Sequence, residues 1–292
     1  MFHGAIPALV TPFRNDGSLS EKKVRELVQF HLRKGTPAVV PAGTTGESPN
    51  LGDKEKQILF ETVVNEANGR LKVIAGTGGN STQHSVELSK VARKIGADAV
   101  LVVAPYYNKP TQEGLYRHYM KIADEGGLPV VIYNVPGRTG VNILPETVER
   151  LSGHERIVAI KEASGSLGQI SEIHRRCGDR LAILSGDDNL TLPILAVGGK
   201  GTISVTANIV PDKISEMIEA FLGGDQERAL LLHHKLEPLH EAMFLETNPI
   251  PVKTAMNLMG MEVGGFRLPL CEMSESNQKK LETVLRRYEL IV

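Results

Sequence analysis

The chain has 292 residues, and its 33 Lys and Arg against 34 Asp and Glu leave a formal net charge of −1. This balance removes the electrostatic attraction that sequence-independent phosphate binding requires, so we expect no nucleic-acid partner. Hydrophobic residues make up 41% of the chain, which suffices for one large core.

The cysteines and the hydropathy of the chain indicate the cellular compartment in which the protein is expected. Cys177 and Cys271 are too far apart in the sequence for a disulfide framework or a paired CxxC metal site. The opening MFHGAIPALVTPF lacks the basic stretch and long apolar core of a signal peptide. There is also no run of about 18 apolar residues, the least that a membrane-spanning helix needs. We therefore expect a soluble cytoplasmic protein with reduced thiols and no membrane partner.

Short apolar runs recur along the first three quarters of the chain and are the candidate strands. They are continuous rather than alternating, which is typical of a parallel sheet with both faces covered by helices. The predicted strands are Ala5–Val10, Ala38–Ala42, Lys72–Gly76, Ala99–Ala104, Val130–Asn134, Ile157–Lys161, Leu181–Ser185 and Thr202–Val205.

Segments with helical spacing lie between these runs. Side-chain oxygens of Ser20, Asp53 and either Ser81 or Thr82 are expected to cap the first three helices. The predicted helices are Ser20–Lys34, Asp53–Asn68, Ser81–Ile95, Thr111–Asp124 and Ser166–Cys177. Eight strand-then-helix units predict the α/β class and favour a (β/α)8 barrel, the TIM barrel, over a doubly wound sheet.

After Pro211 the pattern changes to helices alone. The first of them is expected to close the barrel, and the other three to form a C-terminal helical extension. These predicted helices are Lys213–Leu222, Asp225–Ala242, Pro249–Met259 and Ser276–Leu290. We predict a catalytic barrel over residues 1–224 and a C-terminal helical region over 225–292. That region is too small for a core of its own, so it should pack against the barrel or a partner subunit.

Lys161 is the most informative residue at a strand end, because IVAIKEASG places its ammonium after Ile, Val and Ala. In a barrel, the carboxyl ends of the strands converge on the site of chemistry. Burial there is expected to lower the pKa of the ammonium and supply the free amine that a Schiff base needs. The alternative is a lysine whose stem covers apolar surface while its head reaches water.

Other strand-end groups each have a functional and a plain structural interpretation. Tyr133 can pass protons beside Lys161 or can be a core residue. The loop Gly43–Glu47, GTTGE, can gather backbone N–H groups for an anion or can simply turn the chain. Arg138 has a planar fork suited to a carboxylate, yet it can also be a solvated charge. Asp187 and Asp188 are expected to cap the helix that follows them.

Metal and nucleotide cofactors find no support in the sequence. It has no HExxH motif and no Walker loop, and GTGGN at 76–80 lacks the third spaced glycine of a dinucleotide fingerprint. His233 and His234 are adjacent on one predicted helix, which does not direct both rings to one metal ion. We therefore expect neither a metal site nor a cofactor.

Several motifs together resemble one family, the pyruvate-dependent class I lyases that include dihydrodipicolinate synthase and N-acetylneuraminate lyase. The resemblance spans nearly the whole chain. It rests on GAIPALVTPF, GTTGES, PYYNKPTQEGLYRHY, YNVPGRTG and IKEASG, all at predicted strand ends and in the family's order. An arginine in YNVPGRTG is typical of the synthases rather than of the sugar-acid lyases.

The resemblance implies condensation of pyruvate with L-aspartate 4-semialdehyde to 4-hydroxy-tetrahydrodipicolinate, in lysine and diaminopimelate biosynthesis. It gives Lys161 the imine and Tyr133, Thr44 and Tyr107 a hydroxyl relay, with Tyr107 completing the site of a neighbouring subunit. It thereby implies a homo-oligomer, at least a dimer and in this family a tetramer. The substrate-binding residues that it implies are Thr45, Arg138, Gly186 and Ile203.

The resemblance also implies an effector site for lysine, formed by Ser48, Asn80, Tyr106 and the positions of Lys56 and His84. Members that lysine inhibits tend to have histidine at the position of Lys56 and glutamate at the position of His84. A cation in place of an anion repels the effector's ammonium, so we expect weak or absent lysine inhibition. Two alternative functions stay open: a pyruvate lyase acting on a keto-deoxy sugar acid such as N-acetylneuraminate, and a barrel without activity that senses a small carboxylate.

Overall fold

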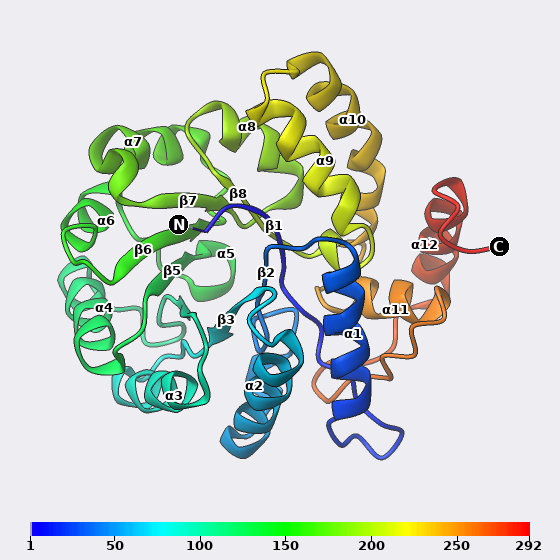
Figure 1. The fold of residues 1–292 in the computed structure, drawn as a ribbon, viewed down its shortest axis with the longest axis horizontal. Helices are drawn as coiled ribbons and strands as arrows, with labels where there is room; N and C mark the ends of the chain where they lie inside the picture. Colours follow the sequence, from blue (N-terminus) through cyan, green and yellow to red (C-terminus); the bar gives the residue numbers. More distant parts are fainter. Residues whose placement is uncertain (1) are drawn as a thin grey trace.

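The computed structural model describes residues 2–292 as eight parallel strands surrounded by helices (Figure 1). The predicted (β/α)8 barrel with its helical C-terminal extension is thus confirmed. The eight predicted runs all contain strands, with ends that differ by a few residues. The strands are β1 (Gly4–Pro7), β2 (Ala38–Val39), β3 (Lys72–Gly76), β4 (Ala99–Val103), β5 (Val130–Asn134), β6 (Ile157–Glu162), β7 (Ala182–Ser185) and β8 (Gly201–Ser204).

The sheet closes on itself between its first two strands. Hydrogen bonding runs in the order β1-β8-β7-β6-β5-β4-β3-β2, and a parallel bridge pairs Ala8 with Val40. Val40 N donates to Pro7 O over 2.9 Å, and Leu9 N donates to Val40 O over 3.0 Å. Closure leaves no open sheet edge on the barrel and brings the strand ends together at one mouth.

Helices cover the outside of the barrel and form its C-terminal region. The predicted helices are all present, and the turns between β5 and β6 and after β7 add short ones. They are α1 (Glu21–Arg33), α2 (Asp53–Ala67), α3 (Thr82–Ile95), α4 (Gln112–Gly126), α5 (Pro136–Thr139), α6 (Pro145–Leu151), α7 (Leu167–Cys177), α8 (Thr191–Ala196), α9 (Pro211–Leu222), α10 (Gln226–Ala242), α11 (Ile250–Leu258) and α12 (Glu275–Arg287). The single-turn 3-10 helices are η1 (Ser48–Asn50), η2 (Gly178–Arg180), η3 (Asp188–Leu190) and η4 (Thr206–Asn208).

The predicted helix caps are only partly correct. Ser81 caps α3, because its hydroxyl accepts from His84 N. Ser20 stands at the N-cap of α1, but its side chain makes no capping hydrogen bond. The Asp53 prediction is wrong: Gly52 is the N-cap of α2, and its N–H donates to the Glu55 carboxylate over 3.1 Å. Asp53 is left free to pair with another element.

Two apolar clusters make up the core. Fully buried Ile6, Ile74, Val131 and Ile203 belong to the smaller cluster, which fills the barrel interior, and Tyr133 lies at its edge. The larger cluster joins the outer faces of the strands to the helices and includes residues of α10, α11 and α12. The C-terminal helices therefore share the core of the barrel, whereas the division at residue 224 stays a prediction.

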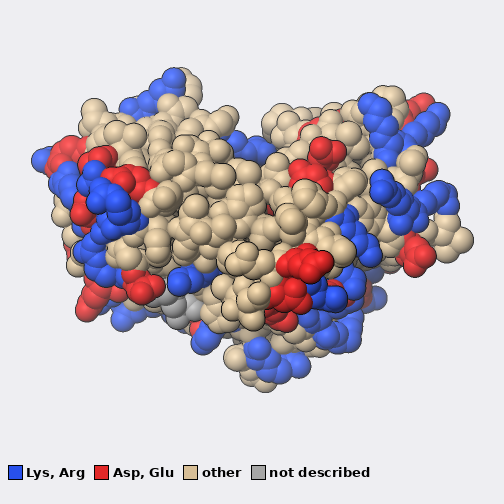
Figure 2. Space-filling model, turned by 90° about the horizontal axis from the view of Figure 1, so that it is seen from above, with Lys and Arg blue, Asp and Glu red and all other residues tan. Residues whose placement is uncertain are grey.

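The surface carries charges of both signs. On the face shown in Figure 2, Lys and Arg are interspersed with Asp and Glu toward both ends, and uncharged side chains cover much of the middle. No helix within residues 2–292 combines the length and the apolar character that crossing a bilayer demands.

Candidate active site

Strand register brings Lys161 and Tyr133 together. These two residues are paired between the parallel strands β6 and β5, so their side chains point to the same face of the sheet. Lys161 Nζ lies 4.3 Å from the centroid of the Tyr133 ring. The side chains are 4% and 6% exposed, so the amine lies at the inner end of the mouth, largely shielded from water.

The next pair in the register lies on the opposite face of the sheet from the Lys161 side chain. Asn134 and Glu162 are fully buried and alternate to the outer face of the sheet, where Asn134 Nδ2 donates to the Glu162 carboxylate over 3.1 Å. Ser164 N donates to the same carboxylate over 2.8 Å. Burial raises the pKa of Glu162, against the effect of these hydrogen bonds. Sequence reasoning missed Glu162, although IKEASG places it beside the lysine.

Gly186 makes room for the lysine side chain. A Cβ at this position would lie 2.6 Å from Ala163 Cβ and 3.1 Å from Lys161 Cε. Its N–H donates to Glu162 O over 2.7 Å, which fixes the turn after β7 against the end of β6. Any side chain at position 186 would therefore displace either the turn or the lysine.

Asp187 and Asp188 do not act as the helix caps that we predicted. Neither side chain makes a capping hydrogen bond. Asp188 is buried, and its Oδ2 accepts instead from Val205 N, Thr206 N and Thr206 Oγ1 at 2.9 to 3.0 Å, which ties the loop after β7 to the loop after β8. Burial raises the pKa of Asp187, while the neighbouring Lys161 charge opposes that rise.

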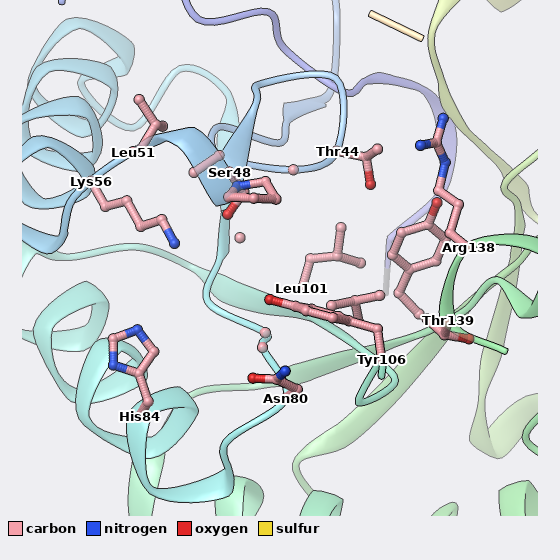
Figure 3. Close-up of a pocket in the computed structure, with 18 of the residues that line it drawn as sticks. Thr44, Ser48, Leu51, Lys56, Asn80, His84, Leu101, Tyr106, Arg138 and Thr139 are labelled. Atoms are coloured by element: carbon pink, nitrogen blue, oxygen red, sulfur yellow. The ribbon is translucent and has the colours of Figure 1, made fainter. Parts of the chain in front are cut away.

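A cavity of about 520 Å³ opens beside this centre. Tyr133, Val135 and Arg138 line one side of it. Figure 3 shows the Thr44 hydroxyl directed into the cavity, toward Leu101, and Tyr106 also lines the cavity. The cavity thus joins the barrel mouth to the region of the predicted effector site.

The Gly43–Glu47 loop presents unused donors. Gly46 N and Ser48 N donate to Gly43 O, and Glu47 N donates to Thr44 O. Within residues 2–292, no acceptor takes the backbone N–H of Thr44 or Thr45. Two such amides and a hydroxyl in one turn form a concave site suited to a carboxylate.

Side chains from the C-terminal region hold this loop, and sequence reasoning missed them. Asn248 Nδ2 donates to Thr45 Oγ1 over 3.0 Å, and Asn248 O accepts from the Arg138 guanidinium over 3.4 Å. Lys253 of α11 forms an ion pair with Glu47 in which both side chains are fully buried. The one available signal was a lysine within the apolar stretch IPVKTAM, the same kind of signal that singled out Lys161.

The five predicted effector-site residues line one end of the cavity. Figure 3 shows Lys56 reaching from α2 and His84 from α3 toward this end, with Ser48, Asn80 and Tyr106 around it. His84 Nε2 lies 3.4 Å from Asp53 Oδ1. Lys56 is 8% exposed, and burial lowers its pKa, opposed by Asp53.

Only three of the predicted catalytic and substrate-binding residues, Thr44, Tyr133 and Arg138, line the cavity itself. Lys161 and Thr45 are next to lining residues, Gly186 is next to Lys161, and two others lie further off. Tyr107 is 90% exposed and has a left-handed backbone with φ of 72°, so it does not meet Lys161, Tyr133 or Thr44 within one subunit. Ile203 is fully buried in the barrel interior, paired in register with Ile6 of β1. The structure therefore groups Lys161 and Gly186 with the lining residue Tyr133, which we call the first wall, and Thr45 with the lining residue Thr44, which we call the second wall.

Comparison with known proteins agrees with the motifs. The model of the dihydrodipicolinate synthetase family matches residues 1–288. The chain belongs to this family. It is 56% identical over 291 residues to the 4-hydroxy-tetrahydrodipicolinate synthase of Thermodesulfovibrio yellowstonii, and the match covers 100% of both chains.

Solved structures of the family have the same fold. Dihydrodipicolinate synthase from Aquifex aeolicus superposes with a TM-score of 0.98 at 49% identity, covering 100% of this chain and 99% of that one. The enzyme from Cyanidioschyzon merolae, solved with lysine bound, gives 0.97 at 41% identity and 99% coverage of each chain. The predicted family, enzyme class and synthase reaction are confirmed, and these relatives give no support to the sugar-acid lyase.

Proposed function

We propose that Lys161 forms an imine with pyruvate and that the enamine derived from it attacks L-aspartate 4-semialdehyde. The Lys161 amine attacks the keto carbon, and water leaves as the protonated imine forms. This imine is an electron sink, so the methyl group loses a proton and becomes a nucleophile. The burial of Lys161 beside Tyr133, next to a cavity with two unused backbone amides, is the observation that carries the proposal.

The two walls of the cavity divide the work in this proposal. The amides of Thr44 and Thr45, with the Thr44 hydroxyl, hold the pyruvate carboxylate. Tyr133 and Thr44, with Tyr107 from a neighbouring subunit, relay protons during formation and collapse of the imine. Arg138 binds the carboxylate of the semialdehyde, because its guanidinium offers paired donors.

The cycle ends when the product leaves Lys161. The enamine carbon bonds to the aldehyde carbon, whose oxygen takes up a proton. The amino group of the bound semialdehyde then attacks the imine carbon and displaces the Lys161 amine, which closes the ring. Because pyruvate binds covalently before the second substrate, the kinetics are expected to be ping-pong.

Trapping with borohydride tests the imine directly. Incubation with pyruvate and borohydride should add the mass of a reduced pyruvate adduct to the peptide that contains Lys161. Lys161→Ala is the control and should gain no mass there. An unmodified Lys161 peptide in the active wild-type enzyme would contradict the proposal.

We further propose that lysine inhibits this enzyme weakly or not at all. Lys56 and His84 line the end of the cavity where the effector's ammonium would lie. The Lys56 ammonium repels it, and His84 lacks the carboxylate that would attract it. An assay with lysine in the millimolar range should show little loss of activity. Strong inhibition at such concentrations would refute this proposal.

The exposed Tyr107 supports a homo-oligomer, a dimer at least and a tetramer as the family implies. A tyrosine that is 90% exposed with a left-handed backbone gains a function when a partner subunit receives it. Mixing inactive Tyr107→Phe and Lys161→Ala subunits should restore part of the activity, and no recovery would count against shared sites. We also place the enzyme in the cytoplasm, which its two free cysteines support.

A further inference from the structure

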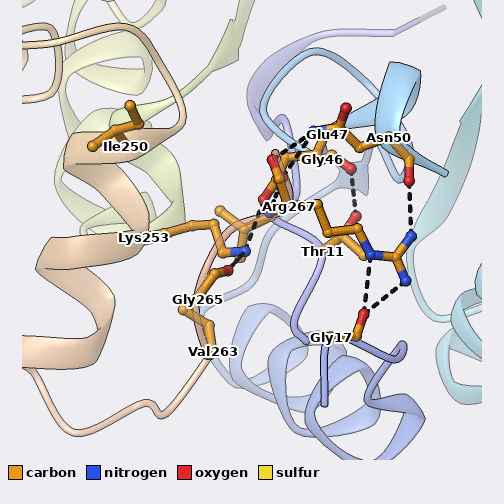
Figure 4. Close-up of polar contacts among 12 residues, drawn as sticks. Thr11, Gly17, Gly46, Glu47, Asn50, Ile250, Lys253, Val263, Gly265 and Arg267 are labelled. Carbon is orange, nitrogen blue, oxygen red and sulfur yellow. Dashed lines mark hydrogen bonds and ion pairs between the residues drawn. The ribbon is translucent and has the colours of Figure 1, made fainter. Parts of the chain in front are cut away.

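A buried ion pair joins the Gly43–Glu47 loop to α11, across 206 positions of the chain (Figure 4). Lys253 Nζ lies 2.8 Å from Glu47 Oε1, and both side chains are 0% exposed. The Lys253 ammonium also donates to Gly265 O and lies 4.4 Å from the ring centroid of Phe13 and 5.1 Å from that of Phe266. A carboxylate, a carbonyl and two aromatic rings thus surround the cation.

Stability alone does not account for this pair. Burying two charges costs solvation free energy, and the attraction between them often does not compensate for that cost. Replacing such a pair by apolar residues of the same shape commonly leaves the protein equally stable. Burial accordingly lowers the pKa of Lys253, while Glu47 opposes that effect. A pair of this kind is better explained by the geometry that it fixes.

The geometry in question is a turn that its own sequence does not favour. Glu47 has φ of 55° and ψ of 38°, a left-handed conformation that residues other than glycine seldom adopt. Ala42, just before the loop, has φ of 54°. The second carboxylate oxygen of Glu47 accepts from Asn50 Nδ2 over 3.2 Å and from Arg267 N over 3.3 Å. Contacts at both oxygens of Glu47 therefore hold the end of the loop.

We propose that Glu47 and Lys253 are positioning residues, which hold the loop so that the amides of Thr44 and Thr45 meet the carboxylate of the keto acid. This inference rests on the proposed binding of pyruvate by the loop. Neither residue touches the reacting atoms, and each acts through the backbone that it fixes. The C-terminal helical region is, in this account, part of the wall that binds substrate.

The test compares a charge-free pair with the wild-type pair. Glu47→Gln and Lys253→Met each keep the size of the side chain, and the double variant removes both charges without leaving one unpaired. We expect the double variant to retain the wild-type Tm within a few degrees. Its KM for pyruvate should nevertheless rise about tenfold, because the amides lose their fixed placement.

The second substrate provides an internal reference. KM for the semialdehyde should rise less than KM for pyruvate, because Arg138 meets the C-terminal region only through the 3.4 Å contact to Asn248 O, whereas Lys253 holds the Gly43–Glu47 loop directly. A purely structural pair would move neither KM once the double variant is folded. A wild-type KM for pyruvate in the stable double variant would therefore overturn the inference.

Glu262→Gln is the matched control. Glu262 pairs with Lys23 of α1 over 2.9 Å, so it too joins the C-terminal region to the N-terminal half of the chain, and neither residue of this pair contacts Glu47 or Lys253. This variant should lower Tm slightly and leave both KM values unchanged. An equal rise in the KM for pyruvate would show that any loosening of the C-terminal region has the same effect, and would refute a specific role for the pair.

Two measurements keep the inference testable if the double variant fails to fold. Glu47→Asp keeps the charge and shortens the side chain by one methylene, and it should raise KM for pyruvate about threefold; an unchanged KM would refute the inference. Borohydride trapping in the wild-type enzyme separates the two proposals. No adduct on Lys161 refutes the proposed function, whereas an adduct with unaffected KM in the variants refutes only the positioning role.

Discussion

The two walls of the cavity are built by different means. At one wall, Lys161 and Tyr133 are placed by the register of neighbouring parallel strands, which backbone hydrogen bonds determine. At the other wall, Thr44 and Thr45 lie on a loop that side chains more than 200 positions away hold in place. The first wall depends on strand register and on the space that Gly186 leaves beside Lys161, whereas the second depends on a few specific side-chain contacts.

Replacing the reacting group at the first wall should have the largest effect. Lys161→Ala removes the only proposed imine-forming amine and should lower kcat by roughly a thousandfold or more. The strand itself is held by backbone bonds, so circular dichroism should show an intact fold. Turnover close to the wild-type rate in this variant would show that Lys161 does not form the imine.

Crowding the same wall should have the next largest effect. Gly186→Ala places a Cβ within 3.1 Å of Lys161 Cε, and displacement of the amine should reduce kcat about a hundredfold. Gly168→Ala is the control, because its Cβ would meet no neighbour closer than 4.0 Å. Similar activities of the two variants would mean that Lys161 does not need its present position.

A single contact at the second wall should matter less. Asn248→Ala removes the 3.0 Å hydrogen bond to Thr45 Oγ1 and should raise KM for pyruvate about fivefold, the usual weight of one neutral hydrogen bond. Asn277→Ala removes an amide bonded to Glu246, away from the cavity, and should change no kinetic constant. If both variants behave alike, the contact to Thr45 does not support the loop.

A buried histidine far from both walls should affect stability alone. Burial lowers the pKa of His31 to about 3, so the folded state keeps the ring neutral while the unfolded chain binds a proton below about pH 6.5. Stability is complete above that pH and falls as pH drops toward 3, by up to about 1.4 kcal/mol per unit. We expect the free energy of unfolding, measured with denaturant between pH 4 and 7, to depend less steeply on pH in His31→Leu than in the wild-type protein, with kcat unchanged. An equal pH dependence in the two proteins would contradict this.

The first wall was predictable from the sequence because its signals are local. A lysine after IVAI and a tyrosine after VVI mark the ends of consecutive strands, and consecutive strands of a barrel are neighbours. The register that pairs them follows from the sheet. The boundaries of the strands and of most helices were recoverable for the same reason, since apolar periodicity is a property of short segments.

At the second wall the sequence indicated Thr44 and Thr45 but not the contacts that hold their loop, because these come from distant segments of the chain. Nothing near GTTGE in the sequence indicates Asn248, Lys253 or Arg267. Asp188 was misjudged as a cap for a related reason: its partners Val205 and Thr206 follow the next strand. Local rules also failed at Asp53, where Glu55 supplies the carboxylate that α2 needs at its N-terminus.

The ion pair between Glu47 and Lys253 has a consequence for recombination between relatives. A chimera that takes the barrel from one parent and the helices after residue 224 from another must match an acid at position 47 with a base at position 253. Parents that both carry the pair can exchange these halves freely at this point. A mismatched pair would leave a charge without a counterion inside the fusion, so the choice of parents matters more than the choice of crossover residue.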